Sequence, residues 1–427
     1  MRSLLARLKR IGVARPLSER DYAFLTVGSL VSLLGDGFFF VALAWQVYEI
    51  SNVPTAMTAV GIAWTLPLLA TVLLGGVLSD RYDRRWLMIG ADLLRGAAIA
   101  VMGVLSIMGV LELWHIVVLM AVIGLGDAVF NPASVALVPD LLPDHLLPQA
   151  NALQGTVRPL MAQLAGPALA GLVVAGIGPG PAFVVDATSF GFSALAVAAI
   201  RHRSRRGGPP AGVASTLREI GEGIAFVRAN AWIWATLVSA MLSLLVFVGP
   251  RQTLVPFLIK NRLELGPEAL GATFAAGGVG AIVCALVIGQ VGLPRRRITA
   301  MYLSWSAGVA LMAVYGVMTE LWHALLASVA IHALFELGQI IWTTLLQQRV
   351  PRAMLGRVSS LDWLVSIGLV PISYALTGPV AGALGATTTL VGAALLGAVL
   401  MGALLFFPGV RDPEREPPFT RGGGSAG

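Results

Sequence analysis

The sequence has few charged residues and almost no cysteine. Of its 427 residues, 12% are charged and 57% are hydrophobic, whereas a typical soluble domain has about 25% charged residues. The mean hydropathy of +0.82 excludes an ordinary soluble fold and predicts an all-α polytopic membrane protein. The one cysteine, Cys284, lies in an apolar run. It excludes a disulfide framework and a thiolate metal site, and we expect a small buried side chain there.

Motifs for ATP hydrolysis and metal-dependent catalysis are also missing. The sequence contains no Walker lysine loop, no His-Glu-x-x-His and no paired metal-ligand spacing. We therefore expect no enzyme, no metal and no cofactor, but a carrier whose energy source is an ion gradient. The net charge of +7 comes from short basic clusters between apolar runs. This distribution is typical of membrane topology rather than of a nucleic-acid surface.

Twelve apolar segments of spanning length recur along the chain. The first is too long for a cleavable signal peptide and lacks a small-residue cleavage site, so we expect it to stay in the membrane. The segments cover residues 22–48, 57–78, 86–110, 113–138, 150–177, 181–200, 232–259, 269–291, 298–318, 321–346, 358–384 and 387–407.

The longest polar interruption divides six spans from six. It begins with a basic, Gly- and Pro-rich linker, after which apolar residues recur at helical spacing and predict an amphipathic helix on the membrane surface. The predicted organisation is a basic tail, a first six-helix bundle, a linker with the surface helix, a second six-helix bundle and a flexible tail, over residues 1–20, 21–200, 201–231, 232–408 and 409–427.

Lysine and arginine gather in one of the two sets of loops. On one side, residues 81–85, 201–206, 295–297 and 349–357 carry thirteen arginines alongside both tails, while the opposite loops hold only Lys260 and Arg262. Because cytoplasmic loops carry the excess of basic residues, both termini are predicted to be cytoplasmic. The expected location is the inner membrane of a bacterial cell.

The second half of the chain repeats features of the first. Val138-Pro139 and Gly166-Pro167 recur at one common offset as Val350-Pro351 and Gly378-Pro379. The segment 76–85 also corresponds loosely to the glycine- and arginine-containing segment 289–297. These matches predict a parallel duplication, with two pseudo-symmetric bundles.

The polar loop after the second span reads Gly-Gly-Val-Leu-Ser-Asp-Arg-Tyr-Asp-Arg-Arg over residues 75–85. It resembles the loop 2–3 motif of the major facilitator superfamily, although Asp83 stands where glycine is commonest. In having aspartate at this position, the chain resembles the exporter-like subgroup of the superfamily. The resemblance implies a conformational latch in which an aspartate pairs with arginines and a glycine permits close helix packing. The residues concerned are Gly76, Asp80, Arg81, Arg84 and Arg85.

The fifth span contains a second family-like signature. Gly166, Pro167 and Gly171 match the antiporter motif of drug–proton exporters, while Ala162 and Ala170 replace two of its glycines. Proline kinks a helix by removing a backbone donor, and small residues allow close helix packing. The resemblance favours export over import.

Several polar residues lie within predicted spans, where each is a candidate functional group. In the superfamily, the first, fourth, seventh and tenth spans line the central cavity. In this chain those spans carry Asp36, Asp127, Arg251, His332, Glu336 and Gln339.

Asp36 is the strongest candidate for proton coupling. It stands roughly 22 Å along its helix, near the bilayer centre, where a carboxyl is either a proton carrier or a hydrogen-bonded structural group. We expect the flanking Gly35 and Gly37 to soften the helix.

The tenth span offers a second candidate pair. His332 and Glu336 share one helix face and form either a proton relay or a structural pair. Arg251 is either the counter-charge of Glu336 or a site for an anionic substrate.

Four further charges lie in or beside the first six spans. Asp127 is expected near the arginines of the loop motif, as in other superfamily members. Asp92 and Arg95 are expected to pair with each other or with the latch. Arg158 and Asp186 receive no predicted role.

Nearly the whole chain resembles the enterobactin and macrolide exporter subgroup of the superfamily. Besides the two signatures, Leu34-Gly35-Asp36 and the segment 148–153, Pro-Gln-Ala-Asn-Ala-Leu, carry this resemblance. It implies proton-coupled efflux of an amphiphilic small molecule, such as a drug, macrolide or siderophore, by a monomer in the lipid bilayer through alternating access. The alternatives are a lipid or lysophospholipid flippase, a solute importer, and a non-transporting membrane receptor or scaffold.

Overall fold

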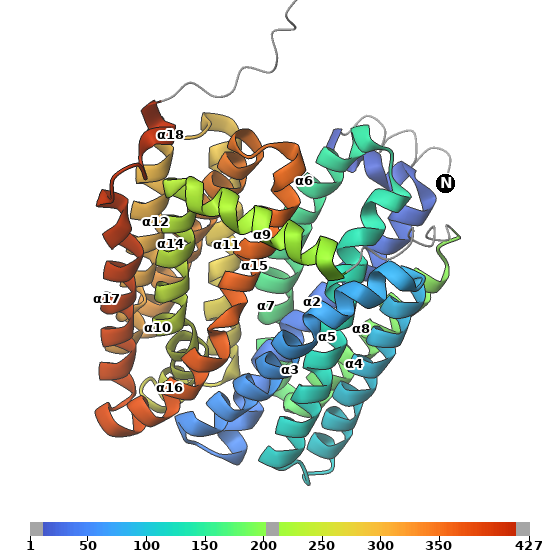
Figure 1. Ribbon diagram of the computed structural model, residues 1–427. Helices are drawn as coiled ribbons and strands as arrows, with labels where there is room; N and C mark the ends of the chain where they lie inside the picture. The colour runs from blue at the N-terminus through green and yellow to red at the C-terminus, as the bar shows by residue number, and fades with distance from the viewer. Residues whose placement is uncertain (1–11, 202–212, 416–427) are drawn as a thin grey trace, which may run out of the picture. The chain divides into compact units, whose positions relative to one another are not determined.

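The computed structural model describes residues 12–201 and 213–415. Over these residues every regular element is a helix, and twelve helical segments are long and apolar enough to cross a membrane. The predicted all-α polytopic fold is therefore confirmed (Figure 1).

The first six spans are built from eight main helical pieces, of which the fifth span uses three in succession. The pieces are α2 (Arg20–Ile50), α3 (Pro54–Arg81), α4 (Arg84–Ile107), α5 (Leu113–Leu141), α6 (Leu147–Arg158), η3 (Pro159–Ala165), α7 (Gly166–Ile177) and α8 (Pro179–Ala198). Two short helices are also present: η1 (Gly12–Ser18) precedes α2, and η2 (Asp144–Leu146) lies between α5 and α6.

The second half begins with the helix that follows the linker and continues with six spans, some of which are also broken. The helices are α9 (Val213–Ala229), α10 (Ala231–Asn261), α11 (Pro267–Val291), α12 (Arg297–Leu311), α13 (Ala313–Val317), α14 (Leu321–Arg349), α15 (Arg352–Gly368), α16 (Val370–Leu384), α17 (Ala386–Ala403), η4 (Leu404–Phe406) and α18 (Asp412–Arg415).

Helix boundaries follow the local sequence. Gly178, between α7 and α8, has φ +85°, and Gly385, between α16 and α17, has φ +82°. Glycine reaches this left-handed conformation without the steric cost of a Cβ. Each glycine therefore permits a tight turn between two consecutive spans, and the same turn occurs in both halves.

The contacts of the chain divide into two units. Unit 1 comprises Met1–Pro210 with Pro256–Gly278, and unit 2 comprises Ala211–Val255 with Val279–Gly427. The end of α10 and the start of α11 thus group with unit 1, although they follow the linker in sequence. The domain borders expected from the sequence stay a prediction.

Unit 1 is packed around α2, α4, α5 and α8. Helix α2 packs against α7 and α8, α3 against α5, and α4 against α5 and α8. A buried cluster with Tyr22, Met88 and Leu137 joins α2, α4 and α5. Large apolar side chains such as Leu172 and Leu195 remain exposed, as expected for surfaces that face lipid rather than water.

Unit 2 has its own apolar core. The indoles of Trp232 on α10 and Trp342 on α14 meet edge to face with their centroids 5.8 Å apart, within a larger buried cluster. Figure 1 shows α9 running crosswise to the spans of this unit. It packs against α15, where Arg357 donates to Glu222 at 2.6 Å. A helix is present here, as the sequence predicted. Its position at a membrane surface stays a prediction. The basic linker before it lies outside the described residues.

Candidate functional site in the first unit

The loop between α3 and α4 anchors the start of α4 to α5. Arg84 forms an ion pair with Asp140 at 2.6 Å and also donates to the carbonyl of Ala136 at 3.0 Å. Asp83 caps α4 by accepting a hydrogen bond from the backbone N–H of Arg85 at 3.0 Å. The unusual aspartate of the motif therefore has a local structural role.

Of the remaining motif residues, the structure describes the side chains of Arg85 and Arg81 but not that of Asp80. The guanidinium of Arg85 donates to the carbonyl of Ala198, at the end of α8, at 3.0 Å, while Arg81 is exposed. The side chain of Asp80 lies outside the described residues, so its pairing in a latch stays a prediction.

The close helix approach expected at Gly76 occurs one residue earlier. A Cβ on Gly75 would lie 1.9 Å from the carbonyl oxygen of Ala128 on α5, whereas Gly76 has open space around it. The expectation for Gly76 was wrong because Gly75, not Gly76, is on the face of α3 that packs against α5.

The fifth-span signature packs against α2 beside Asp36. A Cβ on Gly37 would lie 2.7 Å from Cα of Gly166 and 2.8 Å from Cδ of Pro167. Further along α7, a Cβ on Gly171 would lie 3.1 Å from Cα of Gly271 in the α11 part of unit 1. The small residues of the signature thus allow close backbone approach, as the sequence indicated.

A cavity of about 360 Å³ lies within unit 1. Its walls come from α2, α3, α4, α5, α6 and α8, and therefore include helices beyond the first and fourth spans. The ionisable side chains in its lining are Asp36, Arg95, Asp127, Arg158 and Asp186, and aromatic rings contribute much of the remaining wall.

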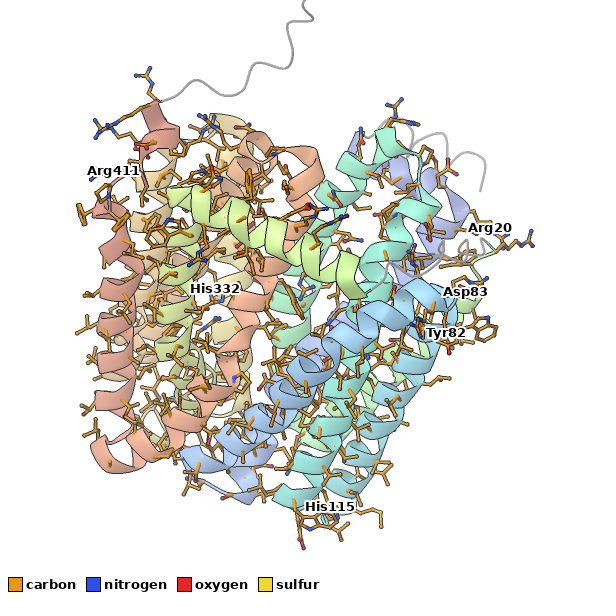
Figure 2. The ribbon with its side chains drawn as sticks, viewed as in Figure 1. Arg20, Tyr82, Asp83, His115, His332 and Arg411 are labelled. Carbon is orange, nitrogen blue, oxygen red and sulfur yellow. The ribbon has the colours of Figure 1, made fainter. Side chains whose placement is uncertain are left out.

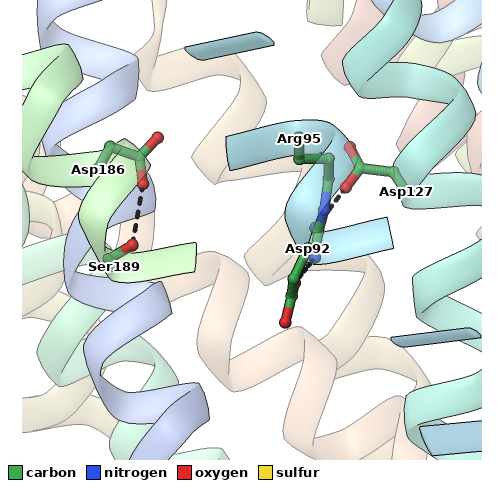
Figure 3. A network of polar contacts seen from close by, with 5 residues as sticks. All are labelled: Asp92, Arg95, Asp127, Asp186 and Ser189. Atoms are coloured by element: carbon green, nitrogen blue, oxygen red, sulfur yellow. Dashed lines mark hydrogen bonds and ion pairs between the residues drawn. The ribbon is translucent and has the colours of Figure 1, made fainter. Parts of the chain in front are cut away.

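Arg95 is the centre of a buried charge cluster, drawn in Figure 3. Its guanidinium pairs with Asp92 on the same helix and donates to Asp127 on α5 at 2.8 Å. It also lies over the rings of Phe130 and Phe190, with distances of 4.2 and 4.5 Å to the ring centroids. These contacts fix the cation among three helices.

The same cluster fixes the positions of the acids. Trp64 on α3 donates from Nε1 to the second carboxylate oxygen of Asp127 at 2.8 Å. The expected Asp92–Arg95 pair is present, and Asp127 joins it instead of the arginines of the loop. Charged groups buried together in this way need both counter-charges and hydrogen bonds; Arg95 supplies the positive charge, while Oδ2 of Asp92 and Nε of Arg95 have no hydrogen-bond partner among the described residues.

Asp36 differs from the acids around Arg95. It is half-buried, lines the cavity, and accepts no hydrogen bond from the described residues. It interacts electrostatically with Arg95 and Arg158 and is repelled by Asp127 and Asp92. Its role in proton exchange stays a prediction.

The predicted residues of the second half lie in unit 2, where Figure 2 shows His332 inside the helices. Arg251 meets Nε2 of His332 at 3.0 Å, and Nδ1 of His332 is 2.9 Å from the carbonyl oxygen of Ser328. A carbonyl only accepts, so Nδ1 carries the hydrogen and Nε2 accepts from Arg251. The histidine is thus neutral, and a second proton on it would break its bond with Arg251.

The other two residues predicted in the tenth span, Glu336 and Gln339, do not share a site with His332. Glu336 is half-buried and accepts no hydrogen bond from the described residues, while Gln339 is exposed and donates to Thr343 at 3.3 Å. Arg251 is therefore the partner of His332 rather than of Glu336.

Sequence reasoning missed the contribution of α6 and α8 to the cavity. Arg158 and Asp186 were noticed as charges in or beside apolar segments, but they were given no role. The useful signal was the presence of an aspartate within the apolar sixth span, because intramembrane carboxyls have a high cost unless they serve a site.

Twelve spans and a charged cavity enclosed by apolar helices define a polytopic transporter of the major facilitator class. Residues 11–417 match the family described as "Transmembrane secretion effector". The chain belongs to this family.

Named relatives cover nearly the same length. The chain is 28% identical to the "Multidrug efflux pump Tap" of Mycobacterium tuberculosis (strain ATCC 25618 / H37Rv), over 94% of this chain and 96% of the relative. It is 24% identical to the "Macrolide efflux protein A" of Streptococcus pyogenes, over 84% and 88% of the two chains.

Solved structures share the fold at low identity. The nucleoside transporter NupG matches with a TM-score of 0.66 and 14% identity, over 90% of this chain and 98% of that chain. A bacterial homologue of the iron transporter ferroportin, in its inward-facing state, matches with a TM-score of 0.66 and 16% identity, over 90% and 98%. These matches support the architecture alone.

Proposed function

We propose that the protein is a proton-coupled exporter of amphiphilic small molecules, with drugs and macrolides as the candidate class. It works by alternating access, as a monomer, in a bacterial inner membrane with both termini in the cytoplasm. Support for export comes from relatives that match over nearly their full length and are named efflux proteins.

The cavity of unit 1 is the observation on which the coupling proposal rests. Asp36 and the aromatic residues Phe39, Phe40 and Trp64 all line this cavity. The rings of Phe40 and Trp64 meet edge to face, with centroids 6.4 Å apart. Aromatic faces bind the apolar part of an amphiphile and attract a cationic group, and the carboxyl supplies the opposite charge.

Competition at Asp36 explains how exchange would occur. A cationic substrate is held best when Asp36 is ionised, and a proton on Asp36 removes that attraction. Proton uptake from one side therefore releases the substrate there, and substrate binding from the other side releases the proton. The Arg95 cluster keeps its charge pairing throughout and holds the walls of the cavity in place.

The test uses energised everted membrane vesicles with ethidium and erythromycin as probes. Wild-type vesicles should accumulate both probes, and an uncoupler or the substitution Asp36→Asn should abolish the accumulation. The matched control is Asp362→Asn, because Asp362 is an intramembrane aspartate in unit 2 that accepts one hydrogen bond from Trp342 at 3.2 Å. This variant should behave like wild type.

Each alternative function predicts a different result. An importer would deplete the probes from everted vesicles, and a flippase would be inhibited by lysophospholipid in preference to drugs. A receptor or scaffold would give equal accumulation for wild type and Asp36→Asn. Equal rates with and without the uncoupler would overturn proton coupling.

A further inference from the structure

Asp186 is a buried acid that neither the proposed function nor the Arg95 cluster uses. It lies on α8 with 0% of its surface exposed, and it contributes to the wall of the same cavity as Asp36. Its one hydrogen bond comes from the hydroxyl of Ser189 to Oδ1, at 3.3 Å. The other carboxyl oxygen, Oδ2, has no hydrogen-bond partner among the described residues.

Among the described residues, no cation forms an ion pair with Asp186. Arg95 is the cation that acts on it electrostatically, and Arg95 already forms ion pairs with both Asp92 and Asp127. Figure 3 shows Asp186 bonded to Ser189, separate from the dashed contacts of Arg95. An ionised Asp186 would therefore be a buried charge without a partner, which protein interiors tolerate poorly.

The ionisable groups on the helices packed against α8 reinforce this conclusion. Helix α2 presents Asp36, α4 presents Asp92 and Arg95, α7 has none, and Asp127 on α5 adds a further negative charge. Three carboxylates on these helices thus lie around Arg95 before Asp186 is counted, and Arg158, the other cation in the cavity lining, acts on Asp36. Asp36 and Asp186 also repel each other when both are charged, and two acids in one site share protons rather than both ionise.

Close packing holds the backbone beside Asp36 against Asp186. A Cβ on Gly35 would lie 2.4 Å from Oδ1 of Asp186 and 2.2 Å from Oγ of Ser189. Glycine at this position lets α2 approach the carboxyl of α8 directly. Asp36 has no hydrogen-bond donor among the described residues, and a protonated Oδ2 of Asp186 needs an acceptor.

We propose that Asp186 is a permanently protonated positioning residue whose O–H donates to the ionised carboxylate of Asp36. The pair then carries one proton when Asp36 is ionised and two when Asp36 is protonated. One proton enters or leaves at Asp36 in each exchange, while the O–H bond of Asp186 is kept. The role in coupling rests on the proposed function, whereas the protonation of Asp186 does not.

Infrared spectra of the purified protein in lipid, at about pH 8, test the protonation directly. Ordinary exposed carboxyls are ionised at this pH, so a protonated Asp186 should give a carboxylic-acid carbonyl band. The band should disappear in Asp186→Asn and in Asp186→Ala, and remain in the control Asp362→Asn. An unchanged spectrum in the two Asp186 variants would show that Asp186 is ionised and would overturn the proposal.

Ser189→Ala keeps the acid and provides a test if the Asp186 variants do not fold. It removes the donor to Oδ1, so the band should shift in frequency without disappearing. No shift would contradict the assignment of the band to Asp186.

Transport assays distinguish a positioning role of Asp186 from a role in which Asp186 exchanges its own proton. Asparagine retains a neutral N–H donor, so Asp186→Asn should keep uncoupler-sensitive accumulation of ethidium, whereas Asp186→Ala should lose it. If Asp186→Asn abolishes accumulation as Asp36→Asn does, Asp186 exchanges its own proton and the proposal is wrong. If wild-type transport ignores the uncoupler, the proposed function fails, while the infrared band still decides the state of Asp186.

Discussion

At the scale of single residues, Arg95 determines how so many acids can be buried together. It forms ion pairs with both Asp92 and Asp127 and is covered by two aromatic rings. The pairing with Asp92 could be predicted, because residues three apart on a helix are neighbours. The pairing with Asp127 could not, since it depends on how α4 packs against α5.

Removing the positive charge of Arg95 should destabilise the protein strongly. Arg95→Gln leaves two acids without their counter-charge, and breaking a buried ion pair costs about 3–5 kcal/mol. We expect a clear fall in the melting temperature of the detergent-solubilised protein, with part of the loss recovered by adding Asp92→Asn. Arg228→Gln, at an exposed site, is the control and should change little. A single Arg95→Gln variant as stable as wild type would contradict this account of the cluster.

At the scale of helices, Gly35 and Gly37 of α2 allow close packing. Helix α2 continues unbroken from Arg20 to Ile50, and the expectation that these glycines soften it stays a prediction. Gly35 meets α8 and Gly37 meets α7. Sequence spacing identifies glycines but not the neighbour that each one approaches.

Gly35→Ala should disrupt the contact between α2 and α8. The added Cβ would overlap the hydroxyl of Ser189 and the carboxyl of Asp186, and such overpacking typically costs about 1–3 kcal/mol. Transport of ethidium should fall together with stability. Gly191→Ala on α8 is the matched control, because nothing lies within 4 Å of its Cβ position and alanine favours a helix by about 1 kcal/mol. Equal behaviour of the two variants would exclude the predicted contact.

The fifth span shows a second limit of sequence reasoning at this scale. Pro167 predicted a kink, since proline cannot donate a backbone hydrogen bond. The structure places a seven-residue π-helix, Pro159–Ala165, immediately before Gly166. Segments of this type often occur at functional sites, and here the distortion lies between the cavity-lining α6 and the glycines that pack on α2.

At the scale of the whole molecule, the twelve spans could be predicted from the length and hydropathy of the apolar segments. The repeat could be predicted from the common sequence offset between matching dipeptides. The structure adds a repeat that was overlooked: Glu112 and Glu320 begin α5 and α14 with the same capping box, completed by His115 and His323. Both occur in an identical Glu-Leu-Trp-His stretch. The cavity could not be predicted, because it depends on the packing of helices that are distant in sequence.

The predicted topology can be tested by sided labelling in a Cys284→Ser background. Val53→Cys and Tyr82→Cys place thiols at exposed residues of successive loops, 48% and 60% accessible in the native chain. A membrane-impermeant maleimide should label the thiol at position 53 in intact cells, and the thiol at position 82 only after permeabilisation, because the basic loop is cytoplasmic. The reverse pattern would invert the topology and the assigned direction of transport.

The most direct test of the central claim follows both fluxes at once in proteoliposomes with an imposed pH gradient. Ethidium movement is measured by fluorescence and proton movement by a trapped pH-sensitive dye. Wild-type protein should move ethidium and protons in opposite directions, each flux depending on the other. Asp36→Asn should show neither flux and should bind ethidium more weakly than wild type, because asparagine carries no negative charge. Ethidium transport without proton movement, or coupled fluxes that persist in Asp36→Asn, would contradict the account.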